Sequence, residues 1–346
     1  MAHNITERDS VISVRDAGWH GLATVLDDYV TPEEAREMAF PWEPVTMPLY
    51  RAVPVVGEDG SLTTRFEEVP GVKGVERSDT GEFFGSVGED YTHATNRELT
   101  QIAEAVEGAG AGEVRVETAG SLKGGRKVWM LLRLNDPIMI KGRRGLADSA
   151  TATLHYFALQ NSHDGTGSFR GQALQTRIIC DNTSQAADVE AESQGTEFTF
   201  RHTSGITDRI EEAQEAVAGW RESVERYNTL MAHMLDLRVT REQQEVFVEN
   251  FLPMPLTTKI VSERVLHNVE KARDEFWAIM AGVTSEGVED TAYGLVQAAI
   301  EFQQHVRGVR GENDLARAES RFKRAYLDRD SLTTVAVNLA REVANA

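Results

Sequence analysis

Two short cationic turns contain the residues of this chain whose types and spacing best fit a chemical task. They group Lys and Arg within a few positions: Lys123, Arg126 and Lys127 in GSLKGGRK, then Lys141, Arg143 and Arg144 in IKGRRG. Ammonium and guanidinium groups placed in this way bind the phosphate oxygens of a nucleic acid backbone. We predict that both turns contact DNA; solvated turns between strands are the alternative.

Positive charge collects around these turns in an otherwise acidic chain. From Arg115 to Ala187 there are ten Lys and Arg residues against five Asp and Glu, whereas the whole chain carries a net charge of −19. A basic segment of this kind marks the place where a polyanion or an anionic ligand binds. The overall acidity argues against coating of duplex DNA by the whole surface, but it permits binding in a confined groove.

Aromatic residues interleave with the basic ones. Tyr156 and Phe169 lie in segments with strand-like alternation, and Arg170 follows directly. Exposed aromatic rings let the bases of a single strand stack on them. We therefore add these three residues to the candidate DNA-binding set, although strand aromatics are also typical of a core.

The glycine-rich run GSLKGGRK does not fit a nucleotide-hydrolysing site. A Walker A loop needs Lys and then Ser or Thr after its second glycine, and it leads into a helix. Here Arg126 and Lys127 follow Gly125 and lead into a strand pattern, VWMLLRL. We therefore expect any activity to be independent of ATP.

Metal and nucleophile chemistry find no support in the residue spacing. His155, His163, Asp164 and His202 match no metal-ligand pattern. There is no GxSxG signature, and the only cysteine, Cys180, lies in an apolar strand pattern. The sequence predicts no catalytic residue, no metal and no cofactor.

The chain also shows no signal for export or for a membrane. Its first residues, MAHNITERDS, lack the apolar core of a signal peptide, and no segment approaches the roughly 18 consecutive apolar residues of a spanning helix. A single cysteine suits a reducing compartment. We expect a cytoplasmic protein with no membrane partner.

The elements that must position these residues fall into three predicted regions. Residues 1–112 are mixed: Thr31 and Pro32 start one helix, Thr95 or Asn96 caps a second over 97–107, and the proline-rich run 42–53 is an extended, edge-like segment. Residues 113–238 hold β-hairpins and a long helix, and residues 239–346 are helical.

The β-rich region is predicted from period-two alternation. Strands are expected over 114–118, 127–134, 151–161, 168–180 and 197–201, with a helix over 182–192. Apolar residues at three- and four-residue steps from Thr207 to Met234 predict one long helix with a single apolar face, which includes Val217, Trp220, Val224 and Tyr227. Further helices are expected over 240–251, 257–280, 292–307, 314–327 and 332–344.

The fold class is therefore α+β. We expect a curved antiparallel sheet of hairpins with the long helix across it, a mixed N-terminal region and a helical C-terminal part. Open sheet edges and the apolar stripe of the long helix favour a homo-oligomer; the alternative is that the stripe only covers its own sheet.

The motif-bearing segments resemble a known family. ETAGSLKGGRKVW, LQNSHDGTGSFR, TRIICDNT, RHTSGITDRIEEA, WHGLATVLDD and VGEDYTHATNREL are similar to segments of the phage/plasmid-like protein family, a domain-of-unknown-function family of phages, prophages and plasmids. The resemblance runs from Gly18 to Trp220. It implies a mobile genetic element in a bacterial cytoplasm, and it transfers no site residue.

The order of hairpins and helix is also similar to the core of phage single-strand annealing proteins of the Red-beta/RecT type, a similarity of fold alone. It favours single-stranded DNA binding and annealing for phage or plasmid recombination by a ring or filament without ATP. A phage exonuclease or a host single-strand-binding protein would be a further partner. The alternative is a mobile-element interaction protein, a host-takeover or anti-defence factor that binds a protein, and a metal-dependent nuclease ranks third.

Overall fold

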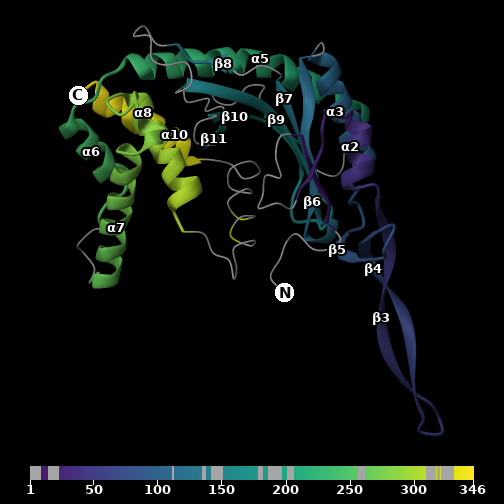
Figure 1. Ribbon diagram of the computed structural model, residues 1–346. Coiled ribbons are helices and arrows are strands. Elements are labelled where there is room, and N and C mark those ends of the chain that lie inside the picture. The colour runs from purple at the N-terminus through teal and green to yellow at the C-terminus, as the bar shows by residue number, and fades with distance from the viewer. Residues whose placement is uncertain are drawn as a thin grey trace.

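The computed structural model describes residues 9–14, 23–110, 113–134, 138–141, 151–177, 182–185, 197–200, 206–255, 262–308, 317, 320 and 331–346. The fold is mixed: antiparallel sheets occupy the first part of the chain, and helices occupy the last (Figure 1). This confirms the predicted α+β class.

The larger sheet is built around two hairpins that the alternation predicted. Its order is β11-β10-β9-β7-β6-β1-β2, with β12 beside β10 and β8 beside β9. The strands are β1 (Val11–Ser13), β2 (Thr24–Val25), β6 (Val114–Leu122), β7 (Lys127–Leu134), β8 (Ile138–Met139), β9 (Ala152–Ser162), β10 (Phe169–Arg177), β11 (Asn182–Gln185) and β12 (Glu197–Phe200). All pairs are antiparallel except β1 with β2.

One face of this sheet is closed by helices. α2 (Pro32–Ala39), α3 (Asn96–Ala109) and the first half of α5 (Ile206–Asp236) contribute to one buried apolar cluster with the strands. Trp220 of α5 lies 5.5 Å from the ring of Phe157, measured between ring centroids. A second cluster, with Trp129, Leu131 and Tyr156, lies among side chains of the other face.

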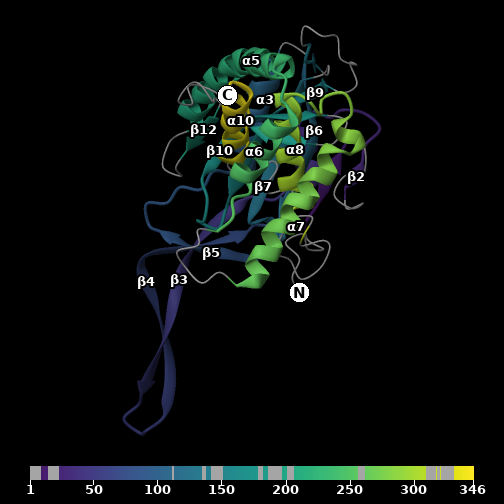
Figure 2. The same ribbon diagram turned by 90° about the vertical axis from the view of Figure 1, so that its left-hand side faces the viewer.

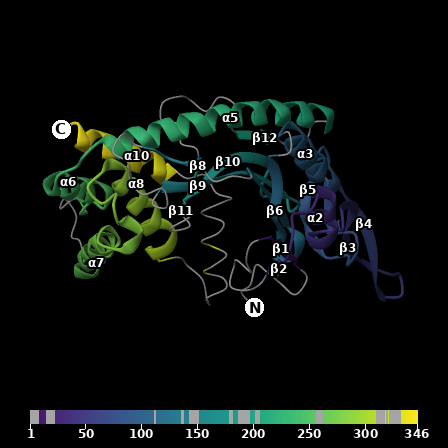
Figure 3. The same cartoon turned by 45° about the horizontal axis from the view of Figure 1, so that its top comes forward.

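The 31 residues of α5 run across the sheet and into the C-terminal part (Figure 3). Tyr227, Met231 and Met234 belong to a third cluster with the C-terminal helices, whereas Trp220 and Val224 belong to the sheet cluster. The described residues of the stripe are thus buried within their own chain, as in the alternative that the stripe covers its own sheet. The long helix is confirmed, and the homo-oligomer stays a prediction.

The C-terminal helices follow the predicted periodicity. They are α6 (Arg241–Phe251), α7 (Glu263–Met280), α8 (Ala292–Glu301), which continues as a π-helix over Phe302–Val306, and α10 (Ser331–Ala344). Of the helix predicted over 314–327, only Arg317 and Ser320 are described, and both are helical; the rest lies outside the described residues. No helix in the described part of the chain combines the length and apolarity that crossing a bilayer needs.

Helix starts are the best-predicted local feature. The side chains of Thr31, Thr95 and Thr240 each accept a hydrogen bond from the backbone N–H three residues later. The Glu or Gln side chain of that later residue in turn accepts a hydrogen bond from the backbone N–H of the threonine. These capping boxes satisfy backbone donors that a helix leaves unpaired. They work from local sequence alone, which is why Thr31 and Thr95 were recognisable.

One predicted helix is wrong. Residues 182–192 were expected to be helical, but β11 covers Asn182–Gln185 and pairs with Leu174–Arg177 of β10. Residues 186–192 lie outside the described residues. An open strand edge offers unpaired backbone groups, and pairing with it outweighs the weak helix propensity of Asn, Thr and Ser.

A second, three-stranded sheet projects from the body. It contains β3 (Pro44–Val56), β4 (Leu62–Arg77) and β5 (Phe83–Gly88), with β3 at its edge as the prolines predicted. The distal halves of β3 and β4 extend beyond the body as a two-stranded ribbon (Figures 1 and 2). We call residues 50–68 the arm.

Candidate nucleic-acid interface

The first cationic turn joins β6 to β7 through a short 3₁₀ turn, Lys123–Gly125. Lys123, Gly124 and Gly125 have φ angles of 59°, 72° and 104°. A Cβ atom at position 125 would lie 2.4 Å from Cζ2 of Trp42, closer than real contacts allow. The glycines therefore serve a tight turn against a buried indole.

Arg126 uses its donors inside the protein. Its Nε donates to the Phe84 carbonyl at 3.0 Å, Nη2 to the Phe83 carbonyl at 2.8 Å, and Nη1 to the Lys123 carbonyl at 3.3 Å. Glu82 lies 3.8 Å from Nη1. The guanidinium thus ties the turn to β5, which is a structural role that the sequence did not reveal.

Acidic groups surround the same turn. Asp9 accepts hydrogen bonds from the Gly124 N–H and the Ser121 hydroxyl, both at 2.9 Å. Arg77 donates to the Gly124 carbonyl at 3.1 Å, and its guanidinium carbon lies 4.6 Å from the Trp42 ring centroid. Charge counted along the chain therefore overstates the positive charge in space at this turn.

The segments quoted for the resemblance converge beside it. Asn96 is fully buried and donates to the Trp42 carbonyl at 2.7 Å, while its Oδ1 lies 2.9 Å from Nε2 of His163. The backbone N–H of His163 donates to the Arg126 carbonyl at 2.8 Å. The side-chain amide of Asn161 donates to the Ala94 carbonyl at 2.8 Å. These bonds lock the turn, the start of α3 and the end of β9 together.

Lys127 and Arg170 lie on the sheet face opposite α5, and both are half-buried. Lys127 of β7 pairs in register with Ser162 of β9, and Arg170 of β10 pairs with Gln160 of β9. Burial raises the pKa of Asp164, but hydrogen bonds from Thr166 and Ser162 and the charge of Lys127 outweigh it, so this pKa lies below its ordinary value. The aspartate in the β9–β10 turn is therefore charged near neutral pH.

The predicted stacking residues do not present open rings. Phe169 is fully buried, and Tyr156 is 3% exposed with its hydroxyl donating to Glu117 Oε1 at 2.8 Å. The stacking role predicted for both is wrong in this structure, because their alternation marked core faces. Phe83, which the sequence reasoning missed, is 43% exposed beside the buried Phe84. Adjacent strand residues point to opposite faces, so this pair was the signal.

The second cationic turn lies away from the first. Lys141 is exposed and follows β8, which pairs with the start of β9, whereas Lys127 pairs with the end of β9. At about 3.3 Å per residue, the two ends of β9 are roughly 30 Å apart. Arg143 and Arg144 lie outside the described residues. The structure therefore does not bring Lys141 to the first turn.

A polar network on the same sheet face was not foreseen. Arg133 and Glu117 form an ion pair of 2.8 Å, and the Arg133 guanidinium carbon lies 5.6 Å from the Tyr29 ring centroid. Both side chains are largely buried. Buried pairs of this kind fix geometry, and they are weak indicators of stability or catalysis.

Among the described residues, no group of three His, Cys, Asp or Glu is placed to hold a metal ion. His163 is bonded to Asn96, and His155 lies 6.1 Å from Tyr227, measured between ring centroids. His202 and Cys180 lie outside the described residues.

Comparison with protein families matches residues 83–326 to the Domain of unknown function (DUF932), and the chain belongs to that family. The match begins at Phe83 and covers the cationic turns, the hairpins and the long helix. No curated protein and no solved structure matches the chain.

Proposed function

We propose that this member of the DUF932 family binds single-stranded DNA and anneals complementary strands for phage or plasmid recombination, as an oligomer and without ATP. The observation that carries the proposal is that Arg126 ties the turn with Lys123 and Lys127, both half-buried, to β5, where Phe83 is 43% exposed. Cations beside an exposed aromatic ring suit phosphates and a base of a flexible strand.

The chemistry is electrostatic and stacking only. Lys123 and Lys127 contact phosphates, Phe83 stacks on a base, and Arg170 extends the cationic surface along β10. With two phosphates neutralised, log K should fall against log salt with a slope of about −1.4, since each phosphate of a single strand contributes roughly −0.7. Lys141 contacts DNA only if the strand runs along the length of the sheet.

A protein partner is the second candidate function. It is favoured by Asp9 and Glu82, which lie beside the first turn and lower its net charge. A mobile-element interaction protein would use Lys123 and Lys127 against an acidic protein surface. Such a protein would bind no oligonucleotide at low salt.

The test is equilibrium binding of labelled single- and double-stranded oligonucleotides at two salt concentrations, in EDTA and without nucleotide. Lys123→Glu with Lys127→Glu should weaken single-strand binding at least about tenfold, because two attractions become repulsions. Lys141→Glu, at the other end of β9, is the matched control and should change affinity less. Arg126 is left unchanged because it is part of the fold.

Absence of binding by the unaltered protein at low salt, or normal binding by the double variant, contradicts the proposal. Cleavage of the oligonucleotide that EDTA abolishes would instead support a metal-dependent nuclease.

A further inference from the structure

The carboxylate of Asp9 occupies two hydrogen-bond donors of the first cationic turn. Its Oδ2 accepts from the Gly124 N–H and its Oδ1 from the Ser121 hydroxyl, both at 2.9 Å. Asp9 itself is half-buried. A backbone N–H and a serine hydroxyl are also donors that proteins offer to phosphate oxygens. The turn therefore already binds one anionic group, and the same chain supplies it.

The peptide group between Lys123 and Gly124 is held at both ends. Its N–H donates to Asp9, and its carbonyl accepts from Nη1 of Arg126 at 3.3 Å. Hydrogen bonds in such a chain polarise one another, so a guanidinium on the carbonyl makes the N–H a stronger donor to an anion.

The backbone at this peptide is also strained. In the described part of the chain, Lys123 is the one residue other than glycine with a positive φ, 59°. Such conformations cost free energy, and they cluster at sites that bind or react. Here the strain places the Gly124 N–H on a carboxylate.

The charges around the turn favour an anion once Asp9 is removed. Lys123 supplies an ammonium on a flexible four-carbon stem from the residue next to Gly124. Arg126 adds its guanidinium through the Lys123 carbonyl. Glu82 is the other acid close by, with Oε1 at 2.9 Å from where a Cβ on Gly124 would lie. Without Asp9, two cations therefore face one carboxylate.

Asp9 can withdraw while the sheet stays intact. The Ser121 N–H donates to the Ser10 carbonyl at 3.1 Å, and β1 follows with Val11 and Ile12 buried in the two faces of the sheet. Asp9 precedes this pairing. Rotation of its side chain and of one peptide is therefore enough to free both donors.

We propose that the Gly124 N–H and the Ser121 hydroxyl form a phosphate subsite next to Lys123, and that Asp9 keeps this subsite closed. The inference rests on the proposed function, to which it adds a third phosphate contact and an autoinhibitory residue. A phosphodiester of a single strand enters when Asp9 withdraws, because both groups are anions that accept hydrogen bonds through oxygen. The unaltered protein thus binds DNA more weakly than its donors and cations permit.

The first experiment needs no DNA. Thermal unfolding of the full chain is followed in inorganic phosphate and in chloride at equal ionic strength. Phosphate should raise the melting temperature of Asp9→Ala by at least about 2 °C more than that of the unaltered protein, because only the variant offers the open subsite. The unaltered protein also corrects for the general stabilisation of folded chains by phosphate.

The donors are tested in the same way. Adding Ser121→Ala to Asp9→Ala removes one of the two donors and should abolish most of the extra phosphate effect. Asp9→Asn keeps the size of the side chain and should show a smaller gain than Asp9→Ala, because an amide oxygen holds the donors less strongly than a carboxylate. Circular dichroism checks that each variant is folded.

The second experiment measures single-strand binding against salt concentration. Asp9→Ala should bind at least about fivefold more tightly at low salt, and its slope of log K against log salt should steepen from about −1.4 to about −2.1, since one more phosphate is neutralised. The change in slope separates an added phosphate contact from a mere loss of repulsion.

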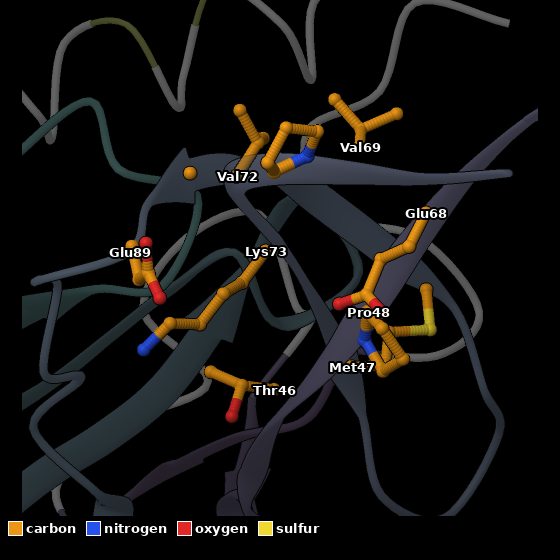
Figure 4. A pocket seen from close by; sticks show the side chains of 10 residues that line it. Thr46, Met47, Pro48, Glu68, Val69, Val72, Lys73 and Glu89 are labelled. Atoms are coloured by element: carbon orange, nitrogen blue, oxygen red, sulfur yellow. The ribbon is translucent and has the colours of Figure 1, made fainter.

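Two glutamates serve as charge controls. Glu82→Gln removes the same charge from the turn while Asp9 stays in place, so affinity should rise less than about threefold with an unchanged slope. Glu89 follows β5, whose six residues put it roughly 20 Å from Glu82. It lines, with Lys73, a groove of about 580 Å³ at the root of the arm (Figure 4). Glu89→Gln should leave affinity within about twofold.

An equal phosphate effect in Asp9→Ala and the unaltered protein overturns this inference. So does an affinity and slope that Asp9→Ala leaves unchanged, or a gain that Glu82→Gln matches in both. A phosphate effect confined to Asp9→Ala, in a protein that binds no oligonucleotide, would keep the anion subsite and contradict the proposed function. The two failures are therefore distinguishable.

Discussion

The larger sheet and the arm are both antiparallel ribbons with alternating side chains, and they differ in what covers them. In the sheet, Phe157 and Leu159 of β9 are fully buried beneath helices. In the arm, Phe66 and Leu62 alternate in the same way and remain mostly exposed. Alternation therefore reports that one face of a strand is apolar, and it does not report which surface covers that face.

The first prediction tests this difference with two aromatic truncations. Trp220→Ala should lower the free energy of unfolding by about 3–5 kcal/mol, because the indole is 2% exposed and lies against Phe157. Phe66→Ala in the arm should change it by less than about 0.5 kcal/mol. Urea denaturation of dilute protein measures both, and a comparable loss from the two would remove the contrast.

The second prediction concerns His155, which lies fully buried between the sheet and α5. Burial lowers its pKa to about 4 from an ordinary value of 6.5. The unfolded chain therefore binds a proton in a pH range where the folded one does not, so stability falls as pH falls from about 6.5 to 4. The full loss is about 3 kcal/mol at roughly 1.4 kcal/mol per pH unit.

Unfolding measured across that range in His155→Gln should lack this part of the acid sensitivity. We expect no contribution to this loss of stability from the arm, which has no residue in the three buried clusters. An unchanged pH slope in the variant would show that His155 is hydrated in solution.

The smallest effect is expected at a turn of the body. Gly125→Ala should lower the free energy of unfolding by about 2–3 kcal/mol, measured by urea denaturation. The φ of 104° at this position strains any residue with a side chain, and the new Cβ would clash with Trp42. Gly81→Ala is the control: its φ of 68° is also positive, but no atom lies within 4 Å, so about 1 kcal/mol is expected. Equal losses would mean that the indole moves aside.

Several features followed from local sequence because local physics controls them. Thr31 and Thr95 start helices through their own side chains, Pro44 and Pro48 keep β3 at an edge, and the stripe that includes Trp220 and Tyr227 predicts α5. The candidate site was less accessible. Arg126 and Tyr156 were assigned to DNA by type, and their hydrogen-bond partners, which come from β5 and β6, give them structural roles.

The sequence by itself determined most element types, most helix starts and the two-faced character of the strands, because these depend on neighbours within a few positions. Tertiary structure decided which faces are covered, since that depends on segments far apart in the chain. It buried Phe169 and left Phe83 and Phe66 exposed, and it separated Lys141 from Lys127 by the length of β9. It also surrounded a basic turn with Asp9 and Glu82, because charge acts through distance in space and not along the sequence.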